Sequence, residues 1–343
     1  MSGYDRNGSA APTRRWLLQA AAFSGGATWA GLGFSQAHGK FRFMTPFGYS
    51  LAFAPVLYAK AGGFLAKEGL DCEILGGKGA ALAAQLAIAG QVEASRTGAG
   101  NYIVARVNNG APLVSIATIA QVSPFFVLSP KDKSLAKADG FKGKTLGMAT
   151  LGGSMEETLN LTLRRAGIDP TGVNKVKVAD NPASYALVEA GRIDGFMGNI
   201  STSIKVQATF PGASSLRLDD GVPGQAYVAN PESIKKNEAA YVAFLRAVHR
   251  AASAILDAKD TGPIIAEIGK AFTIGGLDDI ELAKRDLAAN AESWTAKGRA
   301  NLLRNVPENW SGGIKLMADA GIIKSAPDAA TLYTNALLEK ALR

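Results

Sequence analysis

Cysteine and histidine are almost missing from this 343-residue chain, which has one cysteine, Cys72, and two histidines, His38 and His249. One cysteine cannot form a disulfide within the chain, and the three side chains show no metal-ligand spacing. Cys72 lies in an alternating stretch that predicts a strand, where a lone thiol is typical of a small core residue. No G-x-S-x-G nucleophile elbow and no P-loop spacing occurs. These absences argue against an enzyme built on a metal, a thiol or nucleotide hydrolysis, and no cofactor or metal is expected.

Runs of basic residues with interleaved aromatics are also lacking. Lysine and arginine number 37 and aspartate and glutamate 29, a net charge of +8 that is scattered along the chain. Nucleic-acid binding is therefore not expected, since it needs a basic patch or stripe. The excess charge is compatible with a mild preference for anionic small molecules or anionic membrane surfaces.

The N-terminus has the features of a twin-arginine signal peptide. Arg14 and Arg15 precede a mildly apolar, alanine- and glycine-rich run over residues 20–34, and the small-residue exit Ser-Gln-Ala ends at Ala37. The run is shorter and richer in glycine than the ~20 apolar residues of a membrane span. We predict cleavage after Ala37 and release into the periplasm, with no lipid anchor because the residue directly after the predicted cleavage site is not a cysteine. The alternative is a cytoplasmic protein with an alanine-rich leader.

After residue 40, short apolar strands alternate with helical segments, which predicts an α/β fold with mainly parallel sheets. The economical arrangement has a first lobe of residues 38–123 plus 223–343 and a second lobe of residues 124–222, joined by two hinge crossings. After Val222 the sequence predicts almost only helices. The expected strands are residues 41–47, 70–75, 93–97, 113–120, 145–149, 173–178 and 194–198. The expected helices are residues 53–67, 80–89, 102–108, 156–166, 183–189, a short one from 201, and 232–256, 264–272, 278–292, 307–320 and 329–342.

Residues 141–154 (FKGKTLGMATLGGS) predict a strand followed by a glycine turn and then the start of a helix. Ser154 and Glu157 have the S-x-x-E spacing of a capping box, in which the serine accepts from a first-turn amide and the glutamate reaches back. Gly152 and Gly153 leave that helix end open to a ligand, because helix N-terminal amides attract anions and polar groups. Such a cap is also needed where no ligand binds.

Four segments together resemble the solute-binding proteins of ABC importers, in the family that takes up thiamine-pyrimidine precursors, nitrate, taurine and aliphatic sulfonates. They are APVLYAK (54–60) with GGFL (62–65) and EGL (68–70); QLAIAGQVEA (85–94); FKGKTLGMATLGGS (141–154) with AGI (166–168); and ALVEAGRIDG (186–195). The resemblance implies the type 2 periplasmic binding fold, two lobes that close over a small solute, no chemistry, and delivery to an inner-membrane permease by a monomer.

Ligands of open α/β sheets lie beyond the carboxyl ends of the strands, so the turns after the strands are expected to line one cleft. The predicted ligand contacts are Phe47, Tyr49, Gly77, Lys78, Gly98, Asn101, Gln121, Thr150, Gly153, Ser154, Asn199 and Tyr227, with Gln225 beside them. Phe47 and Tyr49 could stack on a planar solute, while Asn101 and Asn199 could each offer a donor and an acceptor. The competing interpretations are core packing for Phe47, helix capping for both asparagines and solvation for Lys78.

The uncharged stretch Phe196-Met197-Gly198-Asn199 and the Phe47–Tyr49 turn favour a planar solute that is neutral or weakly anionic. Two other functions stay open. One is a periplasmic enzyme on the same scaffold, and the other is a ligand-sensing protein that docks on a membrane receptor instead of a permease.

Overall fold

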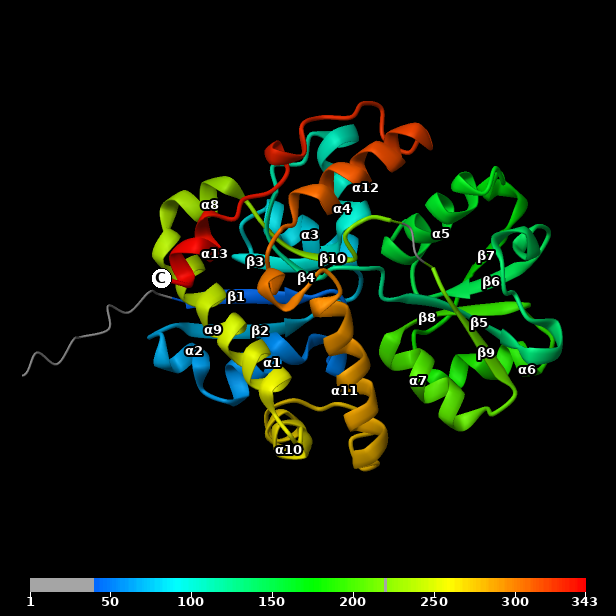
Figure 1. Cartoon of the computed structure of the whole chain (residues 1–343), viewed down its shortest axis with the longest axis horizontal. Coiled ribbons are helices and arrows are strands. Elements are labelled where there is room, and N and C mark those ends of the chain that lie inside the picture. Colours follow the sequence, from blue (N-terminus) through cyan, green and yellow to red (C-terminus); the bar gives the residue numbers. More distant parts are fainter. Residues whose placement is uncertain (1–39, 219–220) are drawn as a thin grey trace, which may run out of the picture. The chain divides into compact units, whose positions relative to one another are not determined.

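The computed structural model describes residues 40–218 and 221–343, so the predicted signal peptide and its cleavage site lie outside the described residues. Two five-stranded sheets form the framework, with helices on both faces of each (Figure 1). The first sheet consists of β1 (Lys40–Thr45), β2 (Asp71–Gly76), β3 (Ala94–Gly98), β4 (Val114–Ala120) and β10 (Gln225–Ala229), in the order β2-β1-β3-β10-β4. The second consists of β5 (Phe125–Pro130), β6 (Thr145–Met148), β7 (Asn174–Lys177), β8 (Gly195–Asn199) and β9 (Ala213–Arg217), in the order β7-β6-β8-β5-β9. We call the elements packed on the first sheet lobe 1 and those on the second lobe 2.

Helices fill most of the segments between and after the strands. In lobe 1 these are α1 (Ala54–Ala61), α2 (Phe64–Lys67), α3 (Ala80–Ile88), α4 (Ala99–Asn109), α8 (Pro231–Lys236), α9 (Glu238–Asp257), α10 (Gly262–Ala271), α11 (Ile280–Thr295), α12 (Pro307–Asp319) and α13 (Ala336–Ala341). In lobe 2 they are α5 (Ser154–Arg165), α6 (Ala186–Glu189) and α7 (Ile200–Thr209).

The predicted α/β fold is confirmed, but each sheet contains one strand that runs antiparallel to its neighbours. β1 pairs in parallel with β2 and β3, and β6 pairs in parallel with β7 and β8. β10 and β5, by contrast, run antiparallel to both of their neighbours. Each of these two strands is the first that the chain enters after crossing from the other sheet. A strand entered in this way is not constrained by the βαβ connection that makes consecutive strands parallel.

The sequence pattern missed three strands and overestimated one helix. Strands β5, β9 and β10 were not predicted, and β10 interrupts the region expected to be almost only helical. The helix expected over residues 329–342 is a single 3₁₀ turn, Ala329–Thr331, followed by α13. Between them Tyr333 bridges to Ser115 of β4, and this sheet contact replaces the helical ladder.

Helix α9 shows how the core of lobe 1 is built. Within residues 40–218 and 221–343, it is the one helix long and apolar enough to cross a membrane. Here its apolar face lies on the first sheet instead: Phe244 stacks on Phe41 with ring centroids 4.7 Å apart and on Phe43 at 5.2 Å. Period-2 alternation in β1 points both phenylalanines to this face, where they are buried. Aromatic contacts of this kind anchor the sheet that carries the site.

Contacts between the lobes occur on both sides of the cleft. On one side the backbone N–H of Gly98, at the end of β3, donates to Ser154 Oγ of α5 at 3.0 Å. On the other side Ser201 of α7 donates to Asp286 Oδ1 of α11 at 2.5 Å, and Asn290 Nδ2 donates to the same oxygen at 2.8 Å. The carboxyl ends of β1, β3, β6 and β8 therefore face a cavity that is closed on two flanks.

Candidate functional site

The cavity has a narrow inner pocket that opens into a wider outer groove. The inner pocket has a volume of ≈ 30 Å³, room for about two water molecules. The outer groove has a volume of ≈ 690 Å³. Five residues line both spaces, so the two are continuous: Phe47, Phe53, Thr150, Asp180 and Asn199.

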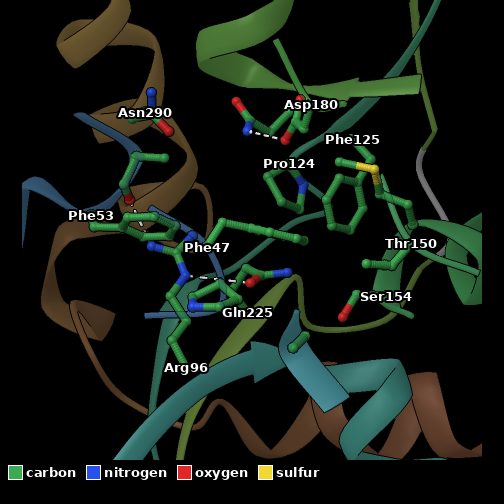
Figure 2. A pocket seen from close by; sticks show the side chains of 15 residues that line it. Phe47, Phe53, Arg96, Pro124, Phe125, Thr150, Ser154, Asp180, Gln225 and Asn290 are labelled. Carbon is green, nitrogen blue, oxygen red and sulfur yellow. Dashed lines mark hydrogen bonds between the residues drawn. The ribbon is translucent and has the colours of Figure 1, made fainter. Parts of the chain in front are cut away.

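Arg96 is the residue that distinguishes the inner pocket (Figure 2). It lies in the middle of β3 and is 4% exposed. Its Nη1 donates to the carbonyl of Ala52 at 2.6 Å and its Nε to Gln225 Oε1 at 3.3 Å, while the guanidinium lies 4.8 Å from the centre of the Phe53 ring. These contacts hold the guanidinium plane in place and use two of its five N–H donors.

No carboxylate neutralises this cation in the part of the chain that the structure describes. Its polar partners are a carbonyl and an amide oxygen, both uncharged. Burial lowers the pKa of the Arg96 guanidinium to about 10, because the charged form loses hydration. Buried charges in proteins are normally paired. A buried arginine that lines a cavity and has no carboxylate partner is therefore suited to bind an anionic group of a ligand.

Gln225 adds a second donor next to Arg96. The side chain is 4% exposed, and its Nε2 has no hydrogen-bond partner although it is buried. Because Oε1 accepts from Arg96, the amide orientation is set and Nε2 is left free to donate. Arg96 and Gln225 come from neighbouring antiparallel strands, β3 and β10, which makes their separation a property of the sheet register.

Lobe 2 contributes a carboxylate, Asp180, from the loop after β7. Its Oδ2 accepts from Asn199 Nδ2 at 2.8 Å and its Oδ1 from Thr202 Oγ1 at 2.7 Å. Burial raises the pKa of Asp180, and these hydrogen bonds oppose the rise. Its side chain is half-buried and lines both the inner pocket and the outer groove. The wall between Arg96 and the groove is mostly apolar, formed by Phe47, Phe53, Pro124, Phe125 and Met155.

The predicted contact residues divide into three groups. Six of them line the inner pocket or the outer groove: Phe47, Tyr49, Lys78, Thr150, Ser154 and Asn199. Gly98 and Asn101 lie with Ser154 at a small void of ≈ 10 Å³ on the flank where α4 meets α5, where Asn101 Nδ2 is 3.5 Å from the Gly152 carbonyl. Four lie elsewhere: Gly77, Gln121, Gly153 and Tyr227 do not line these spaces.

Close contacts or hydrogen bonds with neighbouring residues occupy each residue of the last group. A Cβ on Gly77 would lie 2.3 Å from the Thr45 carbonyl oxygen, and one on Gly153 would lie 2.3 Å from Thr150 Oγ1. Gln121 is fully buried and its Nε2 donates to backbone carbonyls of lobe 1, including that of Arg304 at 3.0 Å. Tyr227 is also fully buried, 4.8 Å from the Phe43 ring, because it lies two residues deeper in β10 than Gln225. The expectation that both residues could face the cleft therefore holds for Gln225 and not for Tyr227.

Two of the side chains that line the cavity are already engaged. Asn199 caps α7 by accepting from the Thr202 N–H at 3.0 Å, and its amide nitrogen binds Asp180, so the capping alternative is realised. Tyr49 donates its hydroxyl to the Ile74 carbonyl at 2.7 Å and packs edge-on against Phe272. Asn101 is not a helix cap, since α4 begins at Ala99.

The capping-box prediction at Ser154 is wrong in its details. α5 begins at Ser154 itself, with Gly153 as the N-cap, and Ser154 Oγ accepts from Gly98 of lobe 1 instead of from its own helix. The carboxylate that reaches back is that of Glu156, whose Oε2 accepts from the Gly152 N–H at 2.7 Å. The Ser154 hydroxyl, which the local pattern assigned to helix capping, is thus used in a tertiary contact with β3.

Sequence reasoning missed Arg96, Phe53, Phe125 and Asp180. The strand-end rule points to residues that follow a strand, whereas Arg96 lies inside β3. A signal was present: the predicted strand over residues 93–97 contains Ser95, Arg96 and Thr97 in a row, and all three are buried. A charged residue inside a short buried strand is costly unless a partner compensates it, and such residues are therefore site candidates.

Comparison with known proteins agrees with this fold. A structure from Bordetella bronchiseptica RB50 superposes with a TM-score of 0.71 at 20% identity, covering 90% of this chain and 97% of that one. The alkanesulfonate-binding protein SsuA from Xanthomonas axonopodis pv. citri, bound to MOPS, gives 0.63 at 14% identity, with 86% and 98% covered. The periplasmic nitrate-binding protein NrtA from Synechocystis PCC 6803 gives 0.62 at 16% identity, with 88% of each chain covered. No curated protein matches the chain by sequence.

A family match covers more than half of the sequence. Residues 50–261 match the family described as NMT1/THI5 like, a span that runs from the turn before α1 to the residue before α10 and includes Arg96, Asp180 and Gln225. The resemblance noted from the four sequence segments is thereby confirmed, and the chain belongs to the NMT1/THI5-like family.

Proposed function

We propose that this protein is the periplasmic solute-binding component of an ABC importer. It captures a small solute with an anionic group in the cavity between its lobes and delivers it to a membrane permease, without catalysing a reaction. In this proposal lobe 1 comprises residues 38–123 plus 223–343 and lobe 2 residues 124–222, and the two lobes move about the crossings near residues 123–124 and 221–224. The protein is exported by its twin-arginine signal and acts as a monomer.

The observation that carries the proposal is the uncompensated guanidinium of Arg96 inside the inner pocket. It changes the expected solute from neutral or weakly anionic to one with a full negative charge at one end. Gln225 Nε2 is the neighbouring donor to the same group. An anion here would gain charge-assisted hydrogen bonds and relieve the cost of an unpaired buried cation. The proteins of similar fold that bind alkanesulfonate and nitrate lend support, since both of those ligands are anions.

The shape of the cavity supports capture of a solute that is larger than its anionic group. The inner pocket has room for that group only, and the outer groove has room for the remainder. Lys78, Lys177 and Lys205 line the groove, so its rim is basic. A basic rim raises the local concentration of anions and speeds their association.

A thermal-shift screen tests the proposal. Sulfonates, nitrate, aromatic carboxylates, pyrimidines and flavin precursors are added at about 100-fold over Kd, where a single site stabilises the protein by about 2.7 kcal/mol. We expect stabilisation by members with a sulfonate or carboxylate and not by their uncharged counterparts. Small-angle scattering with and without the best ligand should show a smaller radius of gyration when the lobes close.

The variant Arg96→Met separates anion capture from general packing. We expect it to weaken binding of the stabilising anion at least 100-fold, and Arg96→Lys to weaken it less, because the lysine keeps the charge but loses the planar fork. Arg217→Met is the matched control, since Arg217 also packs on an aromatic ring, at 5.2 Å from Phe126, but is exposed and outside the cavity. Equal binding by wild type and Arg96→Met would refute the role of Arg96, and stabilisation by no solute would refute capture of this set.

A further inference from the structure

We propose that the solute also carries a hydrogen-bond donor, an amine or a ring N–H, at the end opposite its anionic group, and that Asp180 is the residue that recognises it. The inference rests on the proposed function, because it takes the anionic end of the solute to lie on Arg96. It narrows the substrate class from anions in general to dipolar molecules with an acidic and an amino or N–H end.

Two residues of opposite charge lie apart in one continuous cavity. Arg96 enters it from β3 of lobe 1, and Asp180 enters it from the loop after β7 of lobe 2 (Figure 2). Both line the inner pocket and Asp180 also lines the outer groove, yet the two form no ion pair with each other in the described structure. Opposite charges in a pocket of low polarity attract strongly unless something holds them apart. A dipolar solute between them would satisfy both.

Two neighbouring side chains hold the Asp180 carboxylate in place. Asn199 Nδ2 and Thr202 Oγ1 each donate to a different carboxylate oxygen, at 2.8 and 2.7 Å. Asn199 is itself fixed as the cap of α7. An ionised carboxylate has about four acceptor positions and no donor, so acceptor capacity remains beyond these two bonds. A carboxylate oriented by neighbouring donors in this manner is preorganised for a donor group of a ligand.

An aromatic wall lines the pocket that both charged residues enter. Phe47, Phe53 and Phe125 line the pocket, and Phe47 also packs against the core of lobe 2. These side chains offer no hydrogen bond to a solute, so polar groups of the ligand are expected at its two ends. A short apolar or aromatic spacer fits this distribution. A second anionic group at the Asp180 end would be repelled, which distinguishes the dipolar class from dianions.

Matched pairs of small molecules test the inference by titration calorimetry. The pairs are 4-aminobenzoate and benzoate, 4-aminobenzenesulfonate and benzenesulfonate, and 2-aminoethanesulfonate and ethanesulfonate. In at least one pair we expect the amino member to bind wild-type protein ten-fold or more tightly than its partner. Asp180→Asn should remove that advantage while leaving the affinity for the unsubstituted partner within about three-fold, since the amide retains one acceptor and the size of the side chain.

The control variant is Asp194→Asn, which changes another lobe 2 carboxylate that accepts from the Thr145 N–H and does not line the cavity. It should keep the amino preference. If Asp180→Asn is poorly folded, Thr202→Val provides the second test, because it removes the donor to Asp180 Oδ1 and should reduce the preference without adding an amide to the pocket.

The outcomes separate this inference from the proposed function. Equal affinities within every pair, or an amino preference that survives in Asp180→Asn, would overturn the inference and leave anion capture by Arg96 intact. Binding of the unsubstituted anions alone, in an Arg96-dependent manner, would do the same. Absence of binding by every member of all three pairs would overturn the inference and remove these anions from the proposed function as well.

Discussion

The backbone N–H of Gly98 in lobe 1 donates to the Oγ of Ser154 in lobe 2 at 3.0 Å, and a Cβ on Gly98 would lie 2.4 Å from that same oxygen. The approach of β3 to the start of α5 is thus possible only because Gly98 has no side chain. Its φ of −65° is one that any residue adopts, so the requirement is steric and comes from the contact across the lobes.

Gly98→Ala should therefore oppose lobe closure. We expect weaker binding of the best ligand from the screen, by about ten-fold, because the Cβ must displace Ser154 from β3. Gly48→Ala is the matched control, since Gly48 borders the outer groove and its Cβ would meet nothing within 4 Å. Calorimetry checks the affinity and small-angle scattering checks the closure. The double variant Gly98→Ala with Ser154→Gly should recover part of the affinity, and failure to do so would show that the clash is not the cause.

Asp286 should make the stability of the protein depend on pH. It is fully buried at the contact of α11 with α7, its Oδ2 has no partner, and burial raises its pKa above the ordinary value. The unfolded chain releases this proton at lower pH than the folded protein does, so the folded state binds more protons in between. The free energy of unfolding therefore falls as the pH rises from the ordinary carboxyl pKa through the raised one.

Asp286→Asn should remove that slope. We expect the free energy of unfolding of the variant to rise relative to that of wild type as the pH increases above the ordinary carboxyl pKa, as measured by urea denaturation. Lys205 is the charged group whose field opposes the shift, so the series is repeated in a Lys205→Met background. Asp278→Asn, at an exposed position, is the control and should keep the wild-type slope. An unchanged slope in Asp286→Asn would contradict the assignment.

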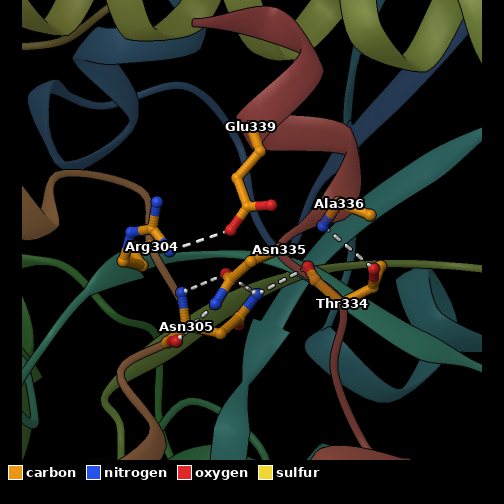
Figure 3. A network of polar contacts seen from close by, with 6 residues as sticks. All are labelled: Arg304, Asn305, Thr334, Asn335, Ala336 and Glu339. Atoms are coloured by element: carbon orange, nitrogen blue, oxygen red, sulfur yellow. Dashed lines mark hydrogen bonds and ion pairs between the residues drawn. The ribbon is translucent and has the colours of Figure 1, made fainter.

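Asn305 holds the C-terminal segment of lobe 1 on the first sheet (Figure 3). The side chain is fully buried; its Oδ1 accepts from Ser115 and Thr118 of β4, and its Nδ2 donates to the Thr334 carbonyl at 3.1 Å. Asn305→Ala leaves these buried groups unpaired and should cost about 3 kcal/mol in the free energy of unfolding. Asn301→Ala, which loses one donated bond to the Lys297 carbonyl, should cost less than about 1 kcal/mol. Equal losses in the free energy of unfolding would show that the buried Asn305 network stabilises the protein no more than the single Asn301 bond does.

Cys72 should be inert in the folded protein. It is fully buried in β2, and burial raises the pKa of its thiol to about 12. Thiolate is the reactive form, so a thiol reagent at neutral pH should label the native protein only as fast as it unfolds. One thiol per chain should react at once in denaturant, since Cys72 is the only cysteine. Rapid labelling without denaturant would mean that β2 opens locally.

Much of the fold follows from local patterns. The alternation of short apolar runs with helical periodicity predicted the α/β class and most of the elements, because period 2 and period 3.6 are set by backbone geometry alone. The strand from Thr145, the turn with Gly152 and Gly153 and the helix after it were recognised in this way. The four family segments also depend only on sequence, and the family match confirms them.

The site was only partly predictable. The strand-end rule pointed to Phe47, Thr150, Ser154 and Asn199, which line the cavity, because parallel strands present their carboxyl ends on one edge. The same rule could not separate Gln225 from Tyr227. Which of the two side chains reaches the cavity depends on how β10 pairs with β3 and β4. This register is set by strands that are distant in the sequence.

Local sequence thus explains why there is a glycine turn at the start of α5, but tertiary structure decides what the turn does. Ser154 binds Gly98 of the other lobe instead of capping its own helix, since a backbone donor of β3 is brought to it by the two crossings. Likewise, Arg96 becomes a ligand-binding candidate only because the fold buries it without a carboxylate and places Asp180 on the opposite wall. Charge compensation acts through space, and spacing along the chain does not reveal it.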